Sequence, residues 1–178
     1  MLRIVLTGPE SSGKTSLAQF LARTFDTGWV PEFARTYLTH TGGVYDADDL
    51  VKIAIGQVSL VHAIGNALRE KPCVFLDTWL YEIRIWSEYR FRKIPPLLDF
   101  LIRDNMPDAF LLCAPDLPWV EDPLRENPDD RDLLFRAYRE AIEGSGVPFF
   151  IVSGDGQVRQ DQAIYAVRKV LSDMTSDT

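Results

Sequence analysis

The stretch Gly8-Pro9-Glu10-Ser11-Ser12-Gly13-Lys14-Thr15 follows a short apolar run, Leu2 to Leu6, and precedes a segment with helical periodicity, Ser16 to Arg23. It fits the pattern G-x-x-x-x-G-K-[ST] of a phosphate-binding loop, and it has the expected place between a strand and a helix. Its glycines allow a tight turn in which successive main-chain N–H groups point at one anion. The alternative, a chance Gly/Ser turn with a solvated lysine, does not account for this context.

The loop pattern also predicts the ligand and the role of its polar side chains. Lys14 supplies a mobile positive charge for the β- and γ-phosphates, and Thr15 supplies a hydroxyl for Mg²⁺. We therefore expect ATP and Mg²⁺ as cofactors, although the loop does not distinguish ATP from GTP. The predicted nucleotide contacts are Gly8, Pro9, Glu10, Ser11, Ser12, Gly13, Lys14, Thr15 and Ser16.

Composition excludes several classes of protein. The chain has 178 residues, of which 46% are hydrophobic, and this predicts a single domain, 1–178, with a sizeable core. A net charge of −7 argues against a sequence-independent nucleic-acid binder, which usually carries a basic patch. Cys73 and Cys113 lie in apolar runs and are predicted to be buried thiols, not a disulfide or a metal site. His40 and His62 are isolated, so neither is predicted to bind metal or transfer protons.

The position of the loop and the length of the apolar runs allow a prediction of the cellular compartment. The phosphate loop begins at residue 8, and the apolar stretches are interpreted as too short to span a bilayer. We expect a cytoplasmic protein with no membrane partner and no nucleic-acid partner. The oligomeric state stays open.

Strand and helix signals alternate along the chain. The expected strands are Leu2–Leu6, Gly28–Pro31, Cys73–Leu76, Ala109–Cys113 and Pro148–Val152. The expected helices are Ser16–Arg23, Glu32–Leu38, Leu50–Glu70, Trp79–Phe91, Pro95–Asp104, Arg131–Glu143 and Val158–Leu171. This alternation predicts an α/β fold of the P-loop NTPase class, a three-layer sandwich around a mainly parallel sheet of about five strands. Ligands of such sheets bind beyond the carboxyl ends of the strands.

Two groups of charged residues follow predicted strands. Asp77 ends an apolar strand, where a carboxylate binds Mg²⁺ or orients the attacking group; its alternative role is to cap the next helix. Glu32 and Arg35 share one helical face, where the carboxylate can bind substrate hydroxyls or take a proton and the guanidinium can steady phosphate charge. The alternative for this pair is a surface ion pair. Which of Glu32 and Asp77 is the base stays open.

A segment rich in proline and charge, about 115–131, is predicted to be a lid. Pro118 to Arg125, with Arg131 beyond it, has the composition of a loop that closes over a nucleotide and excludes water. Arg125 and Arg131 are the candidates to reach the transferring phosphoryl group. The alternative is a solvated charged loop.

Together these segments resemble the ribosylnicotinamide kinase domain of the NadR family. The resemblance rests on Gly8 to Thr15, Glu32-Phe33-Ala34-Arg35, Phe75-Leu76-Asp77-Thr78, and Pro118 to Arg125 with Arg131, in this order over nearly the whole chain. It implies a nucleoside-kinase-like fold and transfer of the γ-phosphate of ATP to the 5′-hydroxyl of nicotinamide riboside. Trp119 and Asp122 would join Glu32, Arg35 and Asp77 at the substrate. Thr15 and Asp77 would hold the metal.

Two residues depart from the family pattern. Trp79 stands where relatives have an acidic residue, and Pro31 stands where they have an aromatic one. Because both positions would lie near the nucleoside, the acceptor is less constrained than the phosphoryl chemistry. The alternatives are another nucleoside or nucleoside monophosphate kinase, or a P-loop regulatory ATPase that hydrolyses ATP without an acceptor.

Overall fold

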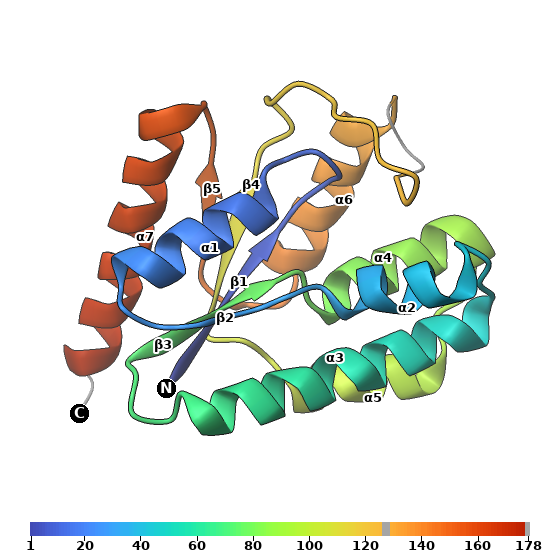
Figure 1. Cartoon of the computed structure of the whole chain (residues 1–178), viewed down its shortest axis with the longest axis horizontal. Coiled ribbons are helices and arrows are strands. Elements are labelled where there is room, and N and C mark those ends of the chain that lie inside the picture. Colours follow the sequence, from blue (N-terminus) through green and yellow to red (C-terminus); the bar gives the residue numbers. More distant parts are fainter. Residues whose placement is uncertain (126–128, 177–178) are drawn as a thin grey trace.

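A computed structural model describes residues 1–125 and 129–176 of the chain. Its five strands form one sheet in the order β2-β3-β1-β4-β5, and every pair is parallel (Figure 1). The strands are β1 (Leu2–Thr7), β2 (Trp29–Val30), β3 (Cys73–Asp77), β4 (Ala109–Cys113) and β5 (Phe149–Val152). Central strand β1 places Ile4 opposite Phe75 on one side and Ala109 on the other. The predicted α/β class and five-stranded parallel sheet are confirmed.

Helices cover both faces of the sheet (Figure 1). They are α1 (Lys14–Thr24), α2 (Phe33–Thr41), α3 (Ala47–Ala67), α4 (Leu80–Phe91), α5 (Pro96–Asp104), α6 (Arg131–Glu143) and α7 (Gly156–Ser176). Helices α1 and α7 pack on one face, whereas α3, α4, α5 and α6 pack on the other. The segment between β4 and α6, which contains the predicted lid, has no helix among its described residues.

Alternation within the strands divides the interior into two cores. In β3, Val74 and Leu76 point into the core beneath α3 to α6, whereas Cys73 and Phe75 point into the core beneath α1 and α7. Both faces of the strand are therefore buried, which explains why its sequence is apolar without polar alternation. Cys73 and Cys113 are buried free thiols, as predicted, and burial raises the pKa of each to about 11.

Caps define where several helices begin and end. Asp46 accepts hydrogen bonds from the backbone N–H groups of Asp48 and Asp49, so α3 starts three residues earlier than predicted. Gly42 ends α2 with φ +65°, as its position after the periodic segment indicates. Helix α7 is longer at both ends than the predicted Val158–Leu171.

Helix α3 is long and apolar enough to cross a membrane by length and composition alone. The prediction that every apolar stretch is too short was therefore wrong for this segment. Core helices of soluble proteins meet the same test. In this fold α3 packs Leu50, Ile53, Ala54 and Val61 into the core beneath the sheet.

Candidate functional site

The loop between β1 and α1 requires glycine at both ends. Gly8 has φ +134°, and a Cβ atom there would lie 2.5 Å from the carbonyl oxygen of Cys113 on the neighbouring strand. Gly13 has φ +77° and precedes the first turn of α1. Any side chain at residue 8 would collide with backbone, and L-residues are strained at either φ value. The two glycines of the motif thus allow the turn and its close approach to β4.

The side chains of Lys14 and Ser12 bind main-chain carbonyl groups of their own loop. Lys14 Nζ donates hydrogen bonds to the carbonyl oxygens of Gly8 and Pro9, at 2.7 and 2.8 Å. Ser12 Oγ donates to Pro9 O at 2.7 Å. These contacts hold the ammonium group of Lys14 against the loop, where a bound phosphate would meet it.

Asp77 and Thr15 meet beside the loop. Thr15 Oγ1 donates to Asp77 Oδ2 at 2.6 Å, while Asp77 Oδ1 is buried and has no hydrogen-bond partner within the described part of the chain. Burial raises the pKa of Asp77, against the opposing effects of Thr15, Lys14 and Arg35. A hydroxyl and a carboxylate with a spare oxygen are the donors that Mg²⁺ accepts from a protein when phosphates and water supply the rest. The residues present therefore fit Mg²⁺.

The backbone just after Asp77 is constrained. Thr78 has φ +68°, an uncommon value for a β-branched residue, and its N–H donates to Leu6 O at 3.0 Å. The chain therefore turns sharply after Asp77, and the carboxylate remains at the end of β3 beside the phosphate loop. Asp77 does not cap α4, because Trp79 occupies the N-cap position of that helix.

Glu32 and Arg35 lie at the start of α2 but do not pair with each other in the described structure. Glu32 occupies the N-cap position without a side-chain capping bond, and its side chain lines the same cavity as Lys14. Burial raises the pKa of Glu32, and the positive charges of Lys14 and Arg35 oppose that rise. Arg35 Nη1 instead donates to Asp122 Oδ2 at 2.8 Å and so links α2 to the lid segment.

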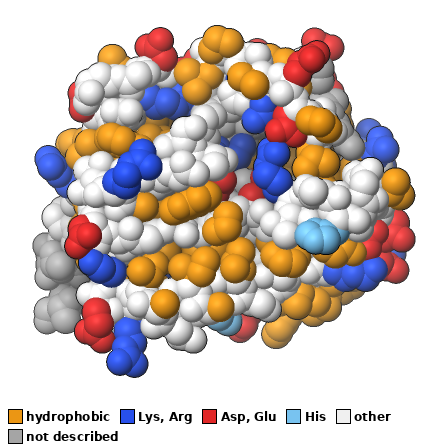
Figure 2. All heavy atoms as spheres, viewed as in Figure 1, with side chains coloured by type: hydrophobic (Ala, Val, Ile, Leu, Met, Phe, Trp, Pro, Cys, Tyr) orange, Lys and Arg blue, Asp and Glu red, His pale blue; other side chains and the backbone are white. Residues whose placement is uncertain are grey.

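One cavity of about 230 Å³ joins these groups. Figure 2 shows basic and acidic side chains gathered around a hollow on this face of the molecule. Beyond the phosphate loop, the cavity runs between α2, α4 and α6, where its lining becomes apolar and aromatic. The side chains of this far end are Ala34, Leu38, Ile85, Trp86, Tyr89, Leu134 and Tyr138. The cavity therefore has an anion-binding end and an end suited to a flat, partly apolar molecule.

The lid segment contributes to the site unevenly. Leu124 and Arg125 line the main cavity, and Arg125 Nη1 also donates to Val120 O. Trp119 and Asp122 line a separate hollow together with Glu121, Pro123 and Arg125. Residues 126–128 of the predicted lid lie outside the described residues.

Of the phosphate-loop residues predicted to bind nucleotide, only Pro9 is missing from the cavity lining.

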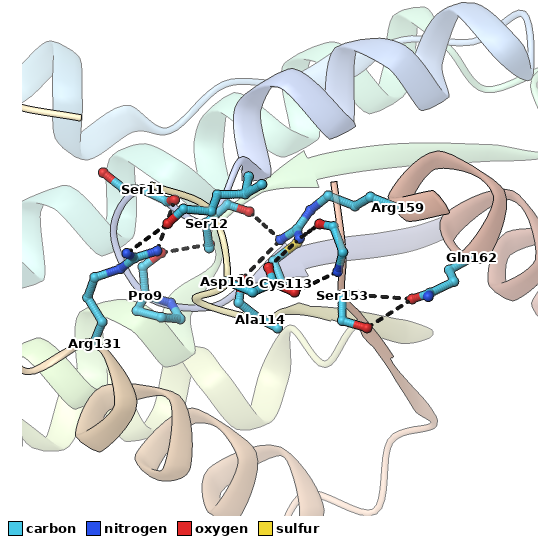
Figure 3. Close-up of polar contacts among 12 residues, drawn as sticks. Pro9, Ser11, Ser12, Cys113, Ala114, Asp116, Arg131, Ser153, Arg159 and Gln162 are labelled. Atoms are coloured by element: carbon cyan, nitrogen blue, oxygen red, sulfur yellow. Dashed lines mark hydrogen bonds and ion pairs between the residues drawn. The ribbon is translucent and has the colours of Figure 1, made fainter. Parts of the chain in front are cut away.

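Arg131, predicted to reach the phosphoryl group, contacts backbone carbonyls in this structure (Figure 3). Its Nε and Nη2 donate to Glu10 O and Ser11 O, both at 3.2 Å, and its Nη1 donates to Leu117 O at 2.9 Å. All these acceptors are carbonyl oxygens of the phosphate loop or of the lid segment. Arg131 thus joins the start of α6 to both segments.

Sequence reasoning missed Arg159, which approaches the loop from α7 (Figure 3). Its Nη2 donates to Ser12 O at 2.6 Å and to Ala114 O at 3.1 Å, and its Nη1 donates to Asp116 Oδ1 at 2.8 Å and to Gly154 O at 2.7 Å. Arg159 is only 5% exposed. In sequence it is one arginine of a charged terminal helix, and no local signal distinguishes it.

Sequence reasoning also missed Glu82, a buried carboxylate of the cavity lining. Its Oε2 accepts from the Trp79 N–H at 3.0 Å and so caps α4, while its Oε1 has no partner among the residues described. Burial raises the pKa of Glu82 to about 7, against the smaller effects of Thr7 and Lys14. The available signal was spacing, because residues 82, 85, 86 and 89 lie on one face of a helix.

The two residues that depart from the family pattern lie outside the cavity lining. Trp79 is 1% exposed, and its indole N–H donates to Asn105 O at 3.0 Å within the core. Pro31 is exposed, and its carbonyl oxygen accepts from Gln57 Nε2. Neither side chain reaches the cavity, so neither substitution alters its walls directly.

Metal-binding clusters outside this site are absent from the described ranges, 1–125 and 129–176. These ranges contain no group of three or more His, Cys, Asp or Glu side chains that could hold a metal ion. His40 is exposed, and its Nδ1 lies 2.7 Å from Thr36 O in the same helix.

Comparison with known proteins identifies the chain's relatives. The trifunctional NAD biosynthesis/regulator protein NadR of Salmonella typhimurium is 30% identical over 127 residues, which are 68% of this chain and 30% of that protein. The protein of the same name from Escherichia coli K12 is 28% identical over 153 residues, 82% of this chain and 37% of that protein. The chain thus spans about a third of the length of these curated relatives.

Solved structures share the fold. A NadR protein in complex with NR superimposes with a TM-score of 0.83 and 22% identity, over 96% of this chain and 50% of that one. A NadR protein in complex with NAD and AMP-PNP gives a TM-score of 0.76, with 22% identity, over 96% and 49% of the two chains. Thymidylate kinase from Candida albicans gives 0.65, with 14% identity, over 96% and 93%. The predicted P-loop kinase fold is confirmed.

Sequence matches and the shared fold together identify the family of this chain. The predicted resemblance to NadR is confirmed by the two curated relatives and by the shared fold. A family model described as an AAA domain matches residues 3–159, from β1 through the phosphate loop to Arg159. This match covers most of the length of the chain, and the chain therefore belongs to that family of AAA domains.

Proposed function

We propose that this chain is an ATP-dependent kinase that transfers the γ-phosphate of ATP to the 5′-hydroxyl of nicotinamide riboside, giving nicotinamide mononucleotide for NAD salvage. One observation carries the proposal. A single cavity joins the phosphate loop with Lys14 to the carboxylates Glu32 and Asp77 and ends between aromatic side chains. The similarity to NadR proteins, one of them in complex with NR and another with NAD and AMP-PNP, supports this acceptor and this donor.

ATP binds with its triphosphate on residues 8–16. The main-chain N–H groups of the loop and the N-terminus of α1 surround the β-phosphate, and Lys14 leaves its carbonyl partners to contact the β- and γ-phosphates. Thr15 and Asp77 would hold Mg²⁺, which would neutralise negative charge on the phosphates. The spare Oδ1 of Asp77 is available for the ion or for one of its waters.

The acceptor occupies the other end of the cavity. Its ring lies among the aromatic side chains of α4 and α6, and its 5′-hydroxyl points to the end of β3. The hydroxyl oxygen forms a bond to the γ-phosphorus while the bond from that phosphorus to the β,γ-bridging oxygen breaks, so ADP leaves. The hydroxyl proton passes to a neighbouring carboxylate, Glu32 or Asp77. A carboxylate whose pKa is raised by burial is well suited to accept it.

The lid segment closes this reaction off from water. Arg125 lines the cavity and supplies positive charge near the transferred group. Asp122 holds Arg35 between α2 and the lid, and Trp119 covers the neighbouring hollow. Exclusion of water favours transfer to the acceptor over hydrolysis. The proposal places this chemistry in the cytoplasm, with neither nucleic acid nor a membrane as partner.

ADP release from Mg·ATP tests the proposal. The purified protein is assayed with nicotinamide riboside, each common nucleoside, nicotinamide mononucleotide, or no acceptor. Strong stimulation by nicotinamide riboside alone is the expected result. Stimulation by a different nucleoside would retain the mechanism and replace the substrate, and acceptor-independent hydrolysis would instead indicate a regulatory ATPase.

A further inference from the structure

The carbonyl groups of the phosphate loop are all occupied. Lys14 binds those of Gly8 and Pro9, Arg131 binds those of Glu10 and Ser11, and Arg159 binds that of Ser12. The carbonyl of Gly13 accepts from Leu17 N within α1. The loop therefore has no unbound carbonyl between residues 8 and 13. Two of the four side chains that bind these carbonyls, Arg131 and Arg159, belong to α6 and α7.

The geometry of the peptide unit relates the direction of these carbonyls to the direction of the N–H groups of the loop. In a trans peptide unit the C=O of one residue and the N–H of the next point in opposite directions. When the carbonyls of residues 10, 11 and 12 face the arginines, the N–H groups of residues 11, 12 and 13 face away from them. Those N–H groups are then directed together to the inner side of the loop, as anion binding requires.

The two arginines hold the loop from different supports (Figure 3). Arg131 belongs to the first turn of α6 and also binds Leu117 O in the lid segment. Arg159 belongs to α7 and is fixed by the carboxylate of Asp116, which in turn accepts from Gly154 N at 2.6 Å. A planar guanidinium with several fixed donors can bind two or more carbonyls at once, whereas a lysine ammonium on a flexible stem cannot hold the same geometry.

We propose that Arg131 and Arg159 are positioning residues that fix the phosphate loop in its anion-binding conformation before nucleotide arrives. This inference rests on the proposed ATP site and assigns Arg131 a role different from direct contact with the phosphoryl group. Pre-ordering of the loop removes a conformational cost that binding would otherwise carry. The two residues thus set the affinity for nucleotide and leave the acceptor end of the cavity unchanged.

The test uses Arg159→Lys and Arg131→Lys, which keep the charge and lose the planar donor set. Each is expected to weaken ATP binding about tenfold, because one or two charge-assisted hydrogen bonds to the loop are lost. The KM for the acceptor should stay within about twofold. Arg168→Lys, on an exposed face of α7, is the matched control and should bind ATP as the wild type does.

Backbone ¹⁵N relaxation in the absence of nucleotide separates positioning from general stability. The order parameters of residues 11–13 are expected to be those of rigid backbone, about 0.85, in the wild type and to fall below about 0.6 in both variants, while those of β3 and β4 are unchanged. Wild-type order parameters of a flexible loop at residues 11–13 would overturn the proposal. So would variants whose ATP affinity stays within twofold of the wild type, whatever their melting temperature.

Arg131 is only partly buried, so Arg131→Lys is expected to fold. If Arg159→Lys does not fold, the ATP affinity of Arg131→Lys alone tests the proposal. If the wild type does not bind ATP, the proposed function fails, while the order parameters of residues 11–13 still confirm or overturn the role of the arginines.

Discussion

Thr15 Oγ1 lies 2.6 Å from Asp77 Oδ2, and this hydrogen bond joins the first turn of α1 to the last residue of β3. It places a hydroxyl, a buried carboxylate and the ammonium group of Lys14 at one end of the cavity. In a reaction that depends on positioning and charge, removal of any of these groups is expected to affect the rate more than the fold.

Lys14→Ala should lower kcat by about two to three orders of magnitude, because the cation that stabilises charge on the transferred phosphoryl group is lost. The measurement is acceptor-dependent ADP release at saturating ATP and acceptor. Lys169→Ala, on an exposed position of α7, is the control and should retain the wild-type rate. A Lys14 variant with a near-normal rate would remove this residue from the mechanism.

Asp77→Asn and Glu32→Gln distinguish the two carboxylates. The Asn variant keeps an oxygen for the Thr15 hydroxyl but loses the charge that holds Mg²⁺, so acceptor-dependent transfer and acceptor-free hydrolysis should both fall at least a hundredfold. The Gln variant should chiefly impair use of the acceptor. Both activities are measured on each variant; equal loss of the two in Glu32→Gln would argue against its place beside the nucleoside.

Gly8→Ala should prevent the loop from adopting its conformation. The added Cβ would lie 2.5 Å from Cys113 O, and φ +134° is strained for alanine. We expect loss of ATP binding, measured by titration, together with a lower melting temperature. Gly65→Ala is the comparison, because that position is helical and its new Cβ would meet only Met1 Cε, at 3.2 Å. This second variant should bind ATP normally.

Glu82 should make stability depend on pH in a defined direction. Its pKa is raised from 4.5 to about 7 in the folded chain, so the folded state binds more protons than the unfolded state between these values. The free energy of unfolding should therefore fall as pH rises through this window, by up to about 3 kcal/mol.

Urea unfolding of wild type and Glu82→Gln at pH 5 and pH 8 measures this effect. The Gln variant keeps an oxygen for the Trp79 N–H and does not titrate, so its stability relative to wild type should increase with pH. Glu88→Gln, on an exposed position of the same helix, should show no such trend. A constant difference between wild type and Glu82→Gln would show that Glu82 is already ionised at pH 5.

Local patterns were sufficient for most of the fold. The apolar runs of β3 and β4 and the glycines of the loop are dictated by burial and by backbone geometry, which act over a few residues. Helix boundaries were less accurate. The start of α3 was predicted at Leu50, three residues late, because the helix begins directly after its cap at Asp46. The topology also brought Asp77 and Glu32 to the loop as expected, because carboxyl ends of parallel strands share one edge.

Contacts between distant segments could not be predicted in the same way. The role of Arg159 depends on acceptors at Ser12, Ala114, Asp116 and Gly154, which no spacing in α7 reveals. Arg131 was singled out for its charge, but its partners are loop carbonyls that are defined only once the chain has folded. Glu82 was overlooked because an acidic residue in the first turn of a helix is ordinary.

The hydrogen bond from Arg159 to Ser12 joins residues 147 positions apart, so the loop acquires this contact late in synthesis. The phosphate loop leaves the ribosome well before α7, which carries the side chain that holds Ser12. A nascent chain that has already formed β1, β3 and β4 still has a loop without this support. If Arg159 orders the loop as proposed, nucleotide binds at full affinity, and stabilises the fold by mass action, only after α7 has docked.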